Sequence, residues 1–549
     1  MDVLVHLAER AGDVVSHDEL LTRYWRGPLS SANAVHKCIA ELRRAFLLHD
    51  PRIDYIETVP KRGYRVAVPV VWSDRLTGSA RDPRPAIAVL PFVNMSSDPE
   101  QDFFSDGIAE DILNRLAQVP QLVVKARTSS FSFKGQNRDV RMIGGLLGVS
   151  HLLEGSVRKA GNRIRITTQL IETNEDKHVW SAQYDRPADD VFTVQDEISL
   201  AVLEALNLHL LNIGRRVQAK VNVRAYHLYL LGRHHNNHMD HTSAITVLDH
   251  ALAIEPGYAD ASAALAEIHF TNTGVAQVPV KSKLPLVREL IDRALAVDPH
   301  HVVARQQRAT VRFMTDRDYQ AALDECADIA RTHANVQLDG YSILLRAIGR
   351  SELALVLADR ALELDPLSAL AHRNRAMFLR DLGRFDEAAE SIEQARLLGL
   401  KVLNELVTLA MDRGDASALA IHLREFRSIV GADHWMYQAH AAALAYMTGE
   451  PSCAKDLLAQ AERCDEYRPS FFKWTLALNA NDLEKAVAFY ADALTQHEHL
   501  AFTWSQGNVG MRRLYPWYYE SAQREEMLRA FGLDRASVAR LKVDAAARS

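Results

Sequence analysis

The sequence predicts a multidomain protein in which an α/β domain and a long all-α region follow a small N-terminal unit. The chain has 549 residues, too many for one hydrophobic core. Strand and helix patterns alternate over residues 86–211, whereas helical patterns with recurring small residues fill residues 224–549. Residues 1–70 combine short helices with one hairpin. Residues 71–85 hold Gly, Ser, Pro and charges without periodicity, which is typical of a linker.

Composition excludes several classes of protein. The chain is 48% hydrophobic and 24% charged, which is ordinary for a globular protein, and its net charge of −6 means that any nucleic-acid surface must be local. No apolar run reaches the roughly 18–20 residues that a membrane span needs, and the charged N-terminus is no signal peptide. The four cysteines form no CxxC pair, so we expect neither disulfides nor a zinc site. Together these features predict a cytoplasmic protein without a membrane anchor.

Residues 1–70 predict two helices joined by a short turn. Ser16 and Glu19 form a capping-box pattern before "LLTRYW", which marks the start of the first of these helices. After Gly27 and Pro28, Ser30 or Ser31 can cap a second helix that runs to about Phe46. Apolar residues share one face of this helix: Val35, Ile39, Leu42 and Phe46.

The opposite face of the second helix predicts contact with DNA. It carries amide and cationic groups, flanked by a histidine and a further arginine, and these groups pair with base edges and phosphates in a major groove. The stretch "YIETVPKRGYRV" then predicts a hairpin with two cations at its tip, beside the helix. The predicted DNA-binding residues are Asn33, His36, Lys37, Arg43, Arg44, Lys61, Arg62 and Tyr64.

Helix, turn, helix and a cationic β-wing together predict a winged helix. "VVSHDELLTRYW", "NAVHKCIAELRRAF" and "YIETVPKRGYRV" resemble the OmpR/PhoB-type winged helix-turn-helix domain over residues 1–70. The resemblance implies that residues 31–46 form the recognition helix. Ala40 and Glu41 stand where many relatives carry cations, so base preference does not carry over.

The start of the chain departs from this family. Its domain usually begins with a small antiparallel sheet, whereas this chain begins inside the helix that follows. We therefore expect a truncated domain in which this sheet is missing, with low stability of residues 1–70 in isolation and a true start codon upstream.

Residues 86–211 predict an α/β domain. "AIAVLPFV", "LVVKAR" and "HVWSAQYD" suit strands, and a hairpin is expected around Gly161-Asn162. "FFSDGIAEDILNRLAQV" and "DDVFTVQDEISLAVLEAL" suit helices, and "VRMIGGLLG" suits a short helix that ends at Gly148. "IAVLPFVNMSSDPEQDFFSDGIAEDI" and "LLEGSVRKAGNRIRITTQLIE" resemble the TolB-like N-terminal domain, a likeness that implies an α/β fold without settled chemistry.

Residues 224–549 predict a TPR-like α-solenoid. Small and large residues recur at the places that a 34-residue tetratricopeptide (TPR) unit requires, and a proline ends the second helix of the unit. Such an array is expected to hold a protein or peptide partner. A generic helical bundle is the alternative. The first copy of the pattern comprises Ala225, Leu228, Leu231, Gly232, Ala244, Leu248, Ala251 and Pro256, and the second comprises Ala369, Ala376, Gly383, Phe385, Ala388, Ile392 and Ala395.

Two other features suggest chemistry less strongly. His234, His238 and His241 have a spacing that can chelate zinc, but polar residues are normal at the end of a repeat helix. Cys38 could be a redox switch, although a small buried side chain suits its place at the edge of the apolar face. The sequence has no GxxxxGK[ST], GxGxxG or HExxH motif. We expect no catalytic residue, no metal and no cofactor.

The sequence thus predicts a one-component, DNA-binding transcription regulator. Its winged helix is expected to read double-stranded promoter DNA, while the α/β domain and the TPR array sense a ligand or hold a partner. Two alternatives stay open. The chain could be a TPR interaction scaffold with a non-functional winged helix, or its central α/β domain could be a nucleotide-handling enzyme.

Overall fold

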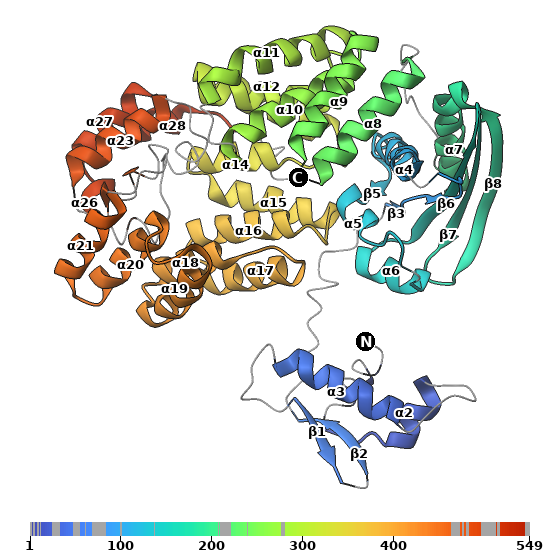
Figure 1. Cartoon of the computed structure of the whole chain (residues 1–549), viewed down its shortest axis with the longest axis horizontal. Coiled ribbons are helices and arrows are strands. Elements are labelled where there is room, and N and C mark those ends of the chain that lie inside the picture. Colours follow the sequence, from blue (N-terminus) through green and yellow to red (C-terminus); the bar gives the residue numbers. More distant parts are fainter. Residues whose placement is uncertain are drawn as a thin grey trace. The chain divides into compact units, whose positions relative to one another are not determined.

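The chain forms two compact units, Met1–Pro83 and Arg84–Ser549, each of which is described by itself (Figure 1). The computed structural model describes most of the second unit and the elements of the first. The described residues are 3, 6, 7, 10, 12–24, 33–47, 55–60, 62–67, 84–98, 101–136, 138–206, 208, 221–238, 240–275, 280–462, 473, 474, 477, 478, 482–495, 512 and 516–543.

The first unit has two described helices and a hairpin around one small core. Helices α2 (His17–Tyr24) and α3 (Asn33–Leu47) precede strands β1 (Ile56–Val59) and β2 (Gly63–Val66), which pair antiparallel. On its other side, β2 bridges Val15, so it lies between two neighbouring segments. The core comprises Val3, Leu7, Val15, Leu20, Val35, Ile39, Ile56, Tyr64 and Val66.

The second unit begins with a mixed sheet. Its strands are β3 (Ala86–Val89), β4 (Val93–Asn94), β5 (Val123–Val124), β6 (His151–Ala160), β7 (Arg163–Glu172) and β8 (Lys177–Pro187). The order is β5-β3-β6-β7-β8, and β4 also pairs with β6. Strand β3 runs parallel to β5 and β6, whereas β6, β7 and β8 form an antiparallel meander.

Alternation along the strands divides the apolar side chains between two cores. Ile87 and Val89 of β3 share one core with α4 (Asp102–Leu116) and α7 (Val191–Ala205). Ala88 lies in a second core with side chains of α6 (Val140–Leu147). Because successive side chains of a strand point to opposite faces, these helices cover opposite faces of the sheet.

The α/β pattern of the sequence agrees with the structure, with two differences. Ala160 pairs with Arg163 across a two-residue turn in which Gly161 has φ +58°, as predicted, and Gly148 ends α6 in the left-handed region. Strand β5, however, contains two residues, fewer than "LVVKAR" suggested. Helix α5 (Arg127–Phe131) was not predicted, because its five residues are too short to show a helical period.

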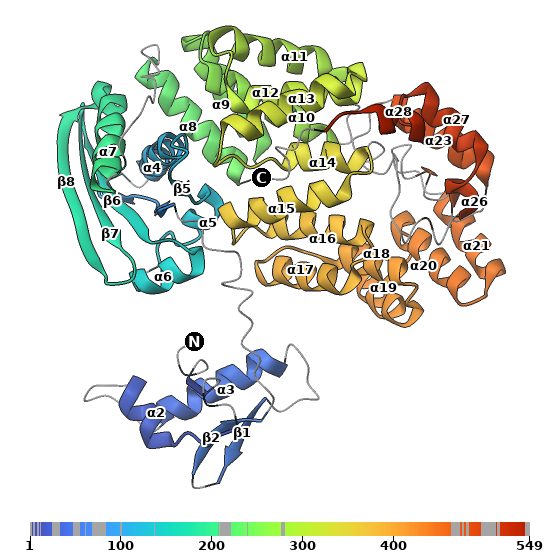
Figure 2. The same ribbon diagram turned by 180° about the vertical axis from the view of Figure 1, so that it is seen from behind.

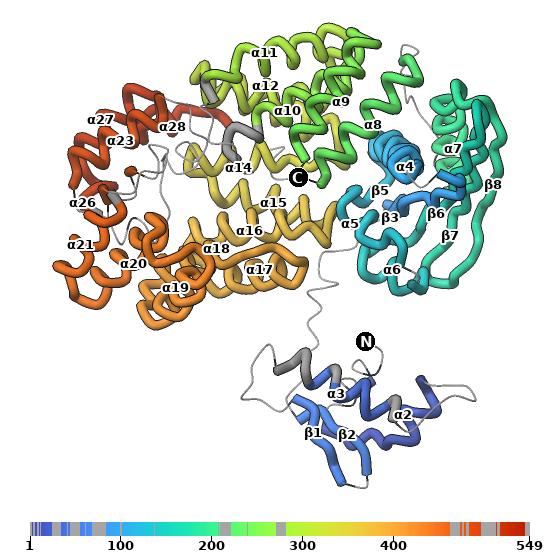
Figure 3. Tube along the Cα trace, in the orientation of Figure 1, coloured from blue at the N-terminus to red at the C-terminus, as the bar shows by residue number. Residues whose placement is uncertain are grey.

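Antiparallel helix pairs follow, as Figure 3 shows along the chain trace. Their bounds are α8 (Val223–Asn237), α9 (His241–Ile254), α10 (Ala259–Val275), α11 (Val280–Val297), α12 (Val302–Val311), α13 (Tyr319–Thr332), α14 (Asp339–Ala347), α15 (Ser351–Leu364), α16 (Ala369–Asp381), α17 (Phe385–Leu397), α18 (Leu403–Arg413), α19 (Ala416–Val430), α20 (Trp435–Met447) and α21 (Pro451–Glu462). Helices α23 (Leu483–Thr495), α26 (Pro516–Tyr519), α27 (Ala522–Ala530) and α28 (Arg535–Arg540) end the described part.

Small residues sit between the helices of a pair, as the repeat pattern predicted. Ala225, Ala244, Leu248 and Ala251 are fully buried between α8 and α9. Gly232 is buried beside them, and an ideal Cβ at this position would lie 2.7 Å from Cγ of Leu248. This glycine therefore sets how closely α8 approaches α9.

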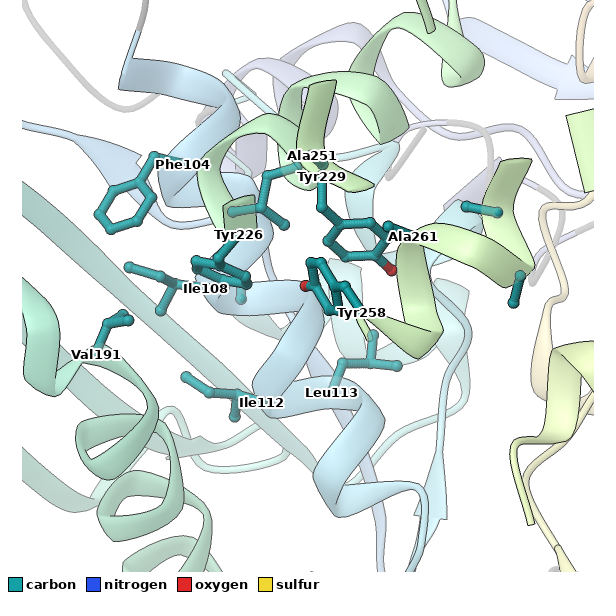
Figure 4. Packing of buried hydrophobic residues seen from close by; sticks show 14 of the residues in the cluster. Phe104, Ile108, Ile112, Leu113, Val191, Tyr226, Tyr229, Ala251, Tyr258 and Ala261 are labelled. Atoms are coloured by element: carbon teal, nitrogen blue, oxygen red, sulfur yellow. The ribbon is translucent and has the colours of Figure 1, made fainter. Parts of the chain in front are cut away.

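Helix α4 joins the sheet to the first repeat. Ile108 and Ile112 pack beneath Tyr226 and Tyr229 of α8 and Tyr258 of the turn before α10 (Figure 4). The α/β domain and the first repeats therefore share one hydrophobic core.

Polar groups on α4 find partners across the same junction. Glu110 accepts hydrogen bonds from Arg127 of α5 (2.8 Å) and from Arg233 of α8 (2.6 Å). Asp111 accepts from the hydroxyl of Tyr226 and from Nε2 of Gln195 (3.0 Å). Burial raises the pKa of Asp111 to about 7, although the bond from Tyr226 acts in the opposite direction.

A second contact lies further along the array. Lys125 donates to the carbonyl oxygen of Glu363 (2.5 Å), and the backbone N–H of Ser129 donates to Asp365 (2.9 Å). Asn335 donates to the carbonyl oxygen of Leu122 (2.9 Å). The end of α15 and the turns before α14 and α16 therefore bind the α/β domain as well.

The C-terminal helices return to the array at α13 (Figure 2). The hydroxyl of Tyr319 donates to the carbonyl oxygen of Phe531 (2.5 Å), and the guanidinium of Arg317 lies 4.4 Å from the Phe531 ring centroid. Gln320 exchanges two hydrogen bonds with the backbone of Lys542 (2.9 and 3.0 Å). The last described helices therefore pack on the middle of the array. Within the described residues, no helix is both long and apolar enough to cross a membrane.

The close approach at Gly232 predicts a stability effect. Replacing Gly232 with Leu should lower the free energy of unfolding by about 1–3 kcal/mol, because the new side chain overpacks against Leu248. Urea unfolding of the full chain checks this. The control is Gly257→Ala, since nothing lies within 4 Å of a Cβ there. Equal midpoints for Gly232→Leu and Gly257→Ala would contradict the packing.

Asp111 predicts a pH dependence. The pKa of its carboxyl is 3.8 in the unfolded chain and about 7 in the folded protein, so the folded state keeps the proton up to a higher pH. The stability that this proton contributes is therefore present below pH 3.8 and lost as the pH rises to about 7. Asp111→Asn, which does not ionise, should lack this decline. Unfolding midpoints between these pH values check it, with exposed Asp249→Asn as the control. Parallel pH profiles for wild type and Asp111→Asn would refute the assignment.

Candidate nucleic-acid interface

The helix-turn-helix of the first unit begins at a capped helix. The backbone N–H of Glu19 donates to Oγ of Ser16 (3.1 Å), which is the first half of the predicted capping box. The carboxylate of Glu19 accepts hydrogen bonds from Nε2 of His6 (3.0 Å) and from Arg10 (2.9 Å). The bond from His6 lowers the pKa of Glu19, and the Arg10 charge acts in the same direction. Helix α2 is thereby tied to the segment before it.

Helix α3 is amphipathic, as predicted. Val35 and Ile39 are buried in the core of the unit, whereas His36 and Lys37 are exposed. Asn33 and Arg44 belong to α3, but their side chains lie outside the described residues. Two of the predicted DNA contacts on this helix are therefore exposed in the described structure.

Arg43 binds the hairpin. Its guanidinium donates to the carbonyl oxygen of Ile56 through Nε (2.9 Å) and Nη2 (2.5 Å), and Nη2 also donates to Oγ1 of Thr58 (2.8 Å). A charged donor on a backbone acceptor contributes about 1.5–3 kcal/mol. The observed geometry gives Arg43 a structural role, and its contact with DNA stays a prediction.

Tyr64 also lies within the unit. It is 3% exposed and its hydroxyl lies 2.6 Å from Nδ1 of His36, within hydrogen-bond distance, so its side chain faces α3 and not solvent. Burial raises the pKa of the Tyr64 hydroxyl, which therefore keeps its proton. The pairing joins residues 28 positions apart, and no local sequence pattern signals such a contact. Sequence reasoning also missed His17, whose ring centroid lies 5.1 Å from that of His36.

The hairpin tip is the predicted wing. The backbone N–H of Arg62 donates to the carbonyl oxygen of Val59 (3.0 Å), which closes a tight turn, and the Arg62 side chain is exposed. Lys61 lies outside the described residues. Gly63 follows with φ +138°, and an ideal Cβ there would lie 2.0 Å from the carbonyl oxygen of Val15. A side chain at position 63 would therefore push the wing away from Val15.

The histidines near the end of α8 and Cys38, which the sequence also suggested, form no metal or redox site among the described residues. His234 and His238 have ring centroids 4.4 Å apart, and Nδ1 of His238 contacts the carbonyl oxygen of His234. Among the described residues, no three His, Cys, Asp or Glu side chains are placed to hold a metal ion. Cys38 is half-buried and packs against the core of the first unit, in keeping with a small packing residue.

Comparisons with known proteins identify the first unit. Residues 1–66 match the family model described as "Transcriptional regulatory protein, C terminal". The predicted winged-helix regulator domain is thereby confirmed. The chain is 41% identical over 73 residues to "Transcriptional activator CadC" of Escherichia coli (strain K12), across 13% of this chain and 14% of the relative.

Other similarities extend beyond this unit. The chain is 37% identical over 265 residues to "Putative adenylate cyclase 3" of Rhizobium meliloti (strain 1021), which covers 44% of this chain and 45% of the relative. The chain thus spans less than half the length of the curated relatives just named. A tetratricopeptide repeat protein from Parabacteroides merdae ATCC 43184 has 16% identity and a TM-score of 0.28, across 51% of this chain and 99% of that structure.

The approach of Gly63 to Val15 predicts a large effect. Gly63→Ala should destabilise the first unit by several kcal/mol, because the methyl group meets backbone and the positive φ adds about 1–3 kcal/mol of strain. Limited proteolysis of the full chain measures it. Gly12→Ala is the control, since Gly12 has φ +89° with nothing within 4 Å. Cleavage at equal rates in the two variants would contradict the steric argument.

Proposed function

We propose that this protein is a one-component transcription regulator whose first unit reads promoter DNA. The observation that carries the proposal is an amphipathic helix, α3, that exposes His36 and Lys37 and is braced against a hairpin with an exposed Arg62 at its tip. The match of residues 1–66 to a regulator family supports it.

The proposed mechanism follows from the width of the DNA grooves. A major groove admits one helix, and α3 would enter it with its exposed face against base edges. The hairpin would then reach the backbone or the adjacent minor groove, where Lys61 and Arg62 meet phosphates. Arg43 and Tyr64 hold α3 and the hairpin together, so both parts would dock as one piece.

The second unit is proposed to supply the signal. Its α/β domain resembles the TolB-like domain, and its helix pairs carry the TPR pattern, an architecture that holds peptides or partner proteins. We infer that a ligand or a protein partner bound to this unit controls the regulator. The shared core at α4 supports this role, because a change in the first repeats would reach the sheet without a flexible joint.

The alternatives make different predictions. A pure scaffold would bind a partner but no DNA. An enzyme would turn over a nucleotide, and the cyclase name of one relative belongs to a protein of which this chain covers 45%. Mapping of chromosomal sites bound by the full chain, together with an assay for nucleotide turnover, separates the three functions. Discrete promoter-bound sites without turnover are expected.

The wing provides the sharper test. Replacing Lys61 and Arg62 with Ala should weaken DNA binding by roughly 1–3 kcal/mol and reduce the salt dependence by about one unit for each lost phosphate contact. Titrations at several salt concentrations measure both effects. Arg65→Ala is the matched control, since Arg65 on the same hairpin is bound to Glu57 (2.5 Å). Unchanged affinity of the double variant at every salt concentration would remove the wing from the interface.

A further inference from the structure

The exposed histidine of α3 is held from two sides. Nδ1 of His36 is hydrogen-bonded to the hydroxyl of Tyr64 (2.6 Å), and the His17 ring lies beside the His36 ring with centroids 5.1 Å apart. Tyr64 itself is fixed, because its backbone exchanges two hydrogen bonds of 2.9 Å with Val15. The His36 ring is therefore oriented by the fold, unlike a long surface side chain.

This hydrogen bond also decides which ring nitrogen carries a proton. A phenol is a stronger acid than a neutral imidazole N–H, so the Tyr64 hydroxyl donates and the ring proton lies on Nε2. If His36 is protonated, Nδ1–H donates to the phenol oxygen instead, and Nε2 still carries its proton. In both states Nε2 is a donor, and among the described residues it has no partner.

A fixed donor on the recognition helix selects among bases. In the major groove, guanine presents two adjacent acceptors, N7 and O6, whereas adenine presents N7 beside an amino group whose hydrogens oppose another donor. A single Nε2–H therefore favours guanine over adenine. Lys37, the other exposed group, ends in a flexible ammonium that suits phosphates and bases alike.

We propose that His36 is a specificity-determining residue that reads a guanine through Nε2, and that Tyr64 is the positioning residue that fixes its ring. The inference rests on the proposed function, because it requires α3 to lie in the major groove. Tyr64 would thus influence base specificity although its side chain is buried away from solvent.

Selection from a randomised DNA pool by the full chain tests the proposal. Wild type should prefer guanine at one position, and Tyr64→Phe should reduce that preference roughly three- to tenfold, as expected for one hydrogen bond, with other positions unchanged. His36→Gln should shift the preference toward adenine, which Gln contacts through N6 and N7. Tyr55→Phe, which removes the hydroxyl of a half-buried tyrosine of the same unit, is the control.

Several outcomes would overturn the proposal. If Tyr64→Phe and wild type select the same bases, Tyr64 has no role in specificity. If Tyr64→Phe loses preference equally at all positions, the role of Tyr64 is merely structural. A wild-type protein that binds no DNA would overturn the proposed function as well.

Nitrogen NMR of histidine-labelled full chain separates the two failures without DNA. The His36 signal, assigned by its loss in His36→Gln, should report a proton on Nε2 in wild type and a mixture of tautomers in Tyr64→Phe. A wild-type ring with its only proton on Nδ1 would refute the positioning step, whatever the protein does with DNA.

Discussion

The burial of α4 on both sides is the constraint on which the larger unit depends. The helix shares one hydrophobic core with the sheet and α7 and also with the first repeat. An ideal Cβ on Gly107 would lie 2.3 Å from a methyl group of Leu230, so α4 and α8 approach as closely as a glycine permits. An element buried in this way cannot leave one neighbour without exposing apolar surface on both, at a cost of about 25 cal/mol per Å².

That burial imposes a condition on the polar side chains of α4. Buried charges are tolerated when they are paired and hydrogen-bonded. Glu110 meets two arginines, one from α5 and one from α8, and Asp106 binds Lys134 (2.7 Å). Asp111 has neutral partners instead, and burial raises the pKa of its carboxyl to about 7. Since these partners come from both sides of α4, the polar network specifies how the α/β domain docks on the helices.

The first unit has a much smaller core, and side-chain hydrogen bonds hold its parts together. Two contacts join its helix α3 to the hairpin. Arg43 of α3 binds the backbone of Ile56, and Tyr64 of the hairpin binds His36 of α3. His36 and Arg43 are seven residues apart, which is two helical turns, so they face the same side. This flank binds the hairpin, and His36 and the neighbouring Lys37 are both exposed to a ligand.

The sequence alone determined the longer elements and their kinds. Alternating strands, the turn at Gly161, the cap at Ser16 and the spacing of alanines around Gly232 all express local rules, which act within one or two turns of chain. The winged helix was also readable, because its wing carries a specific pattern. Only the tertiary structure decided that the α/β domain and the repeats share a core, and that Tyr64 is a buried partner of His36. Those contacts join residues far apart in the chain, such as Ser129 and Asp365, and depend on side-chain packing between faces that no local period encodes.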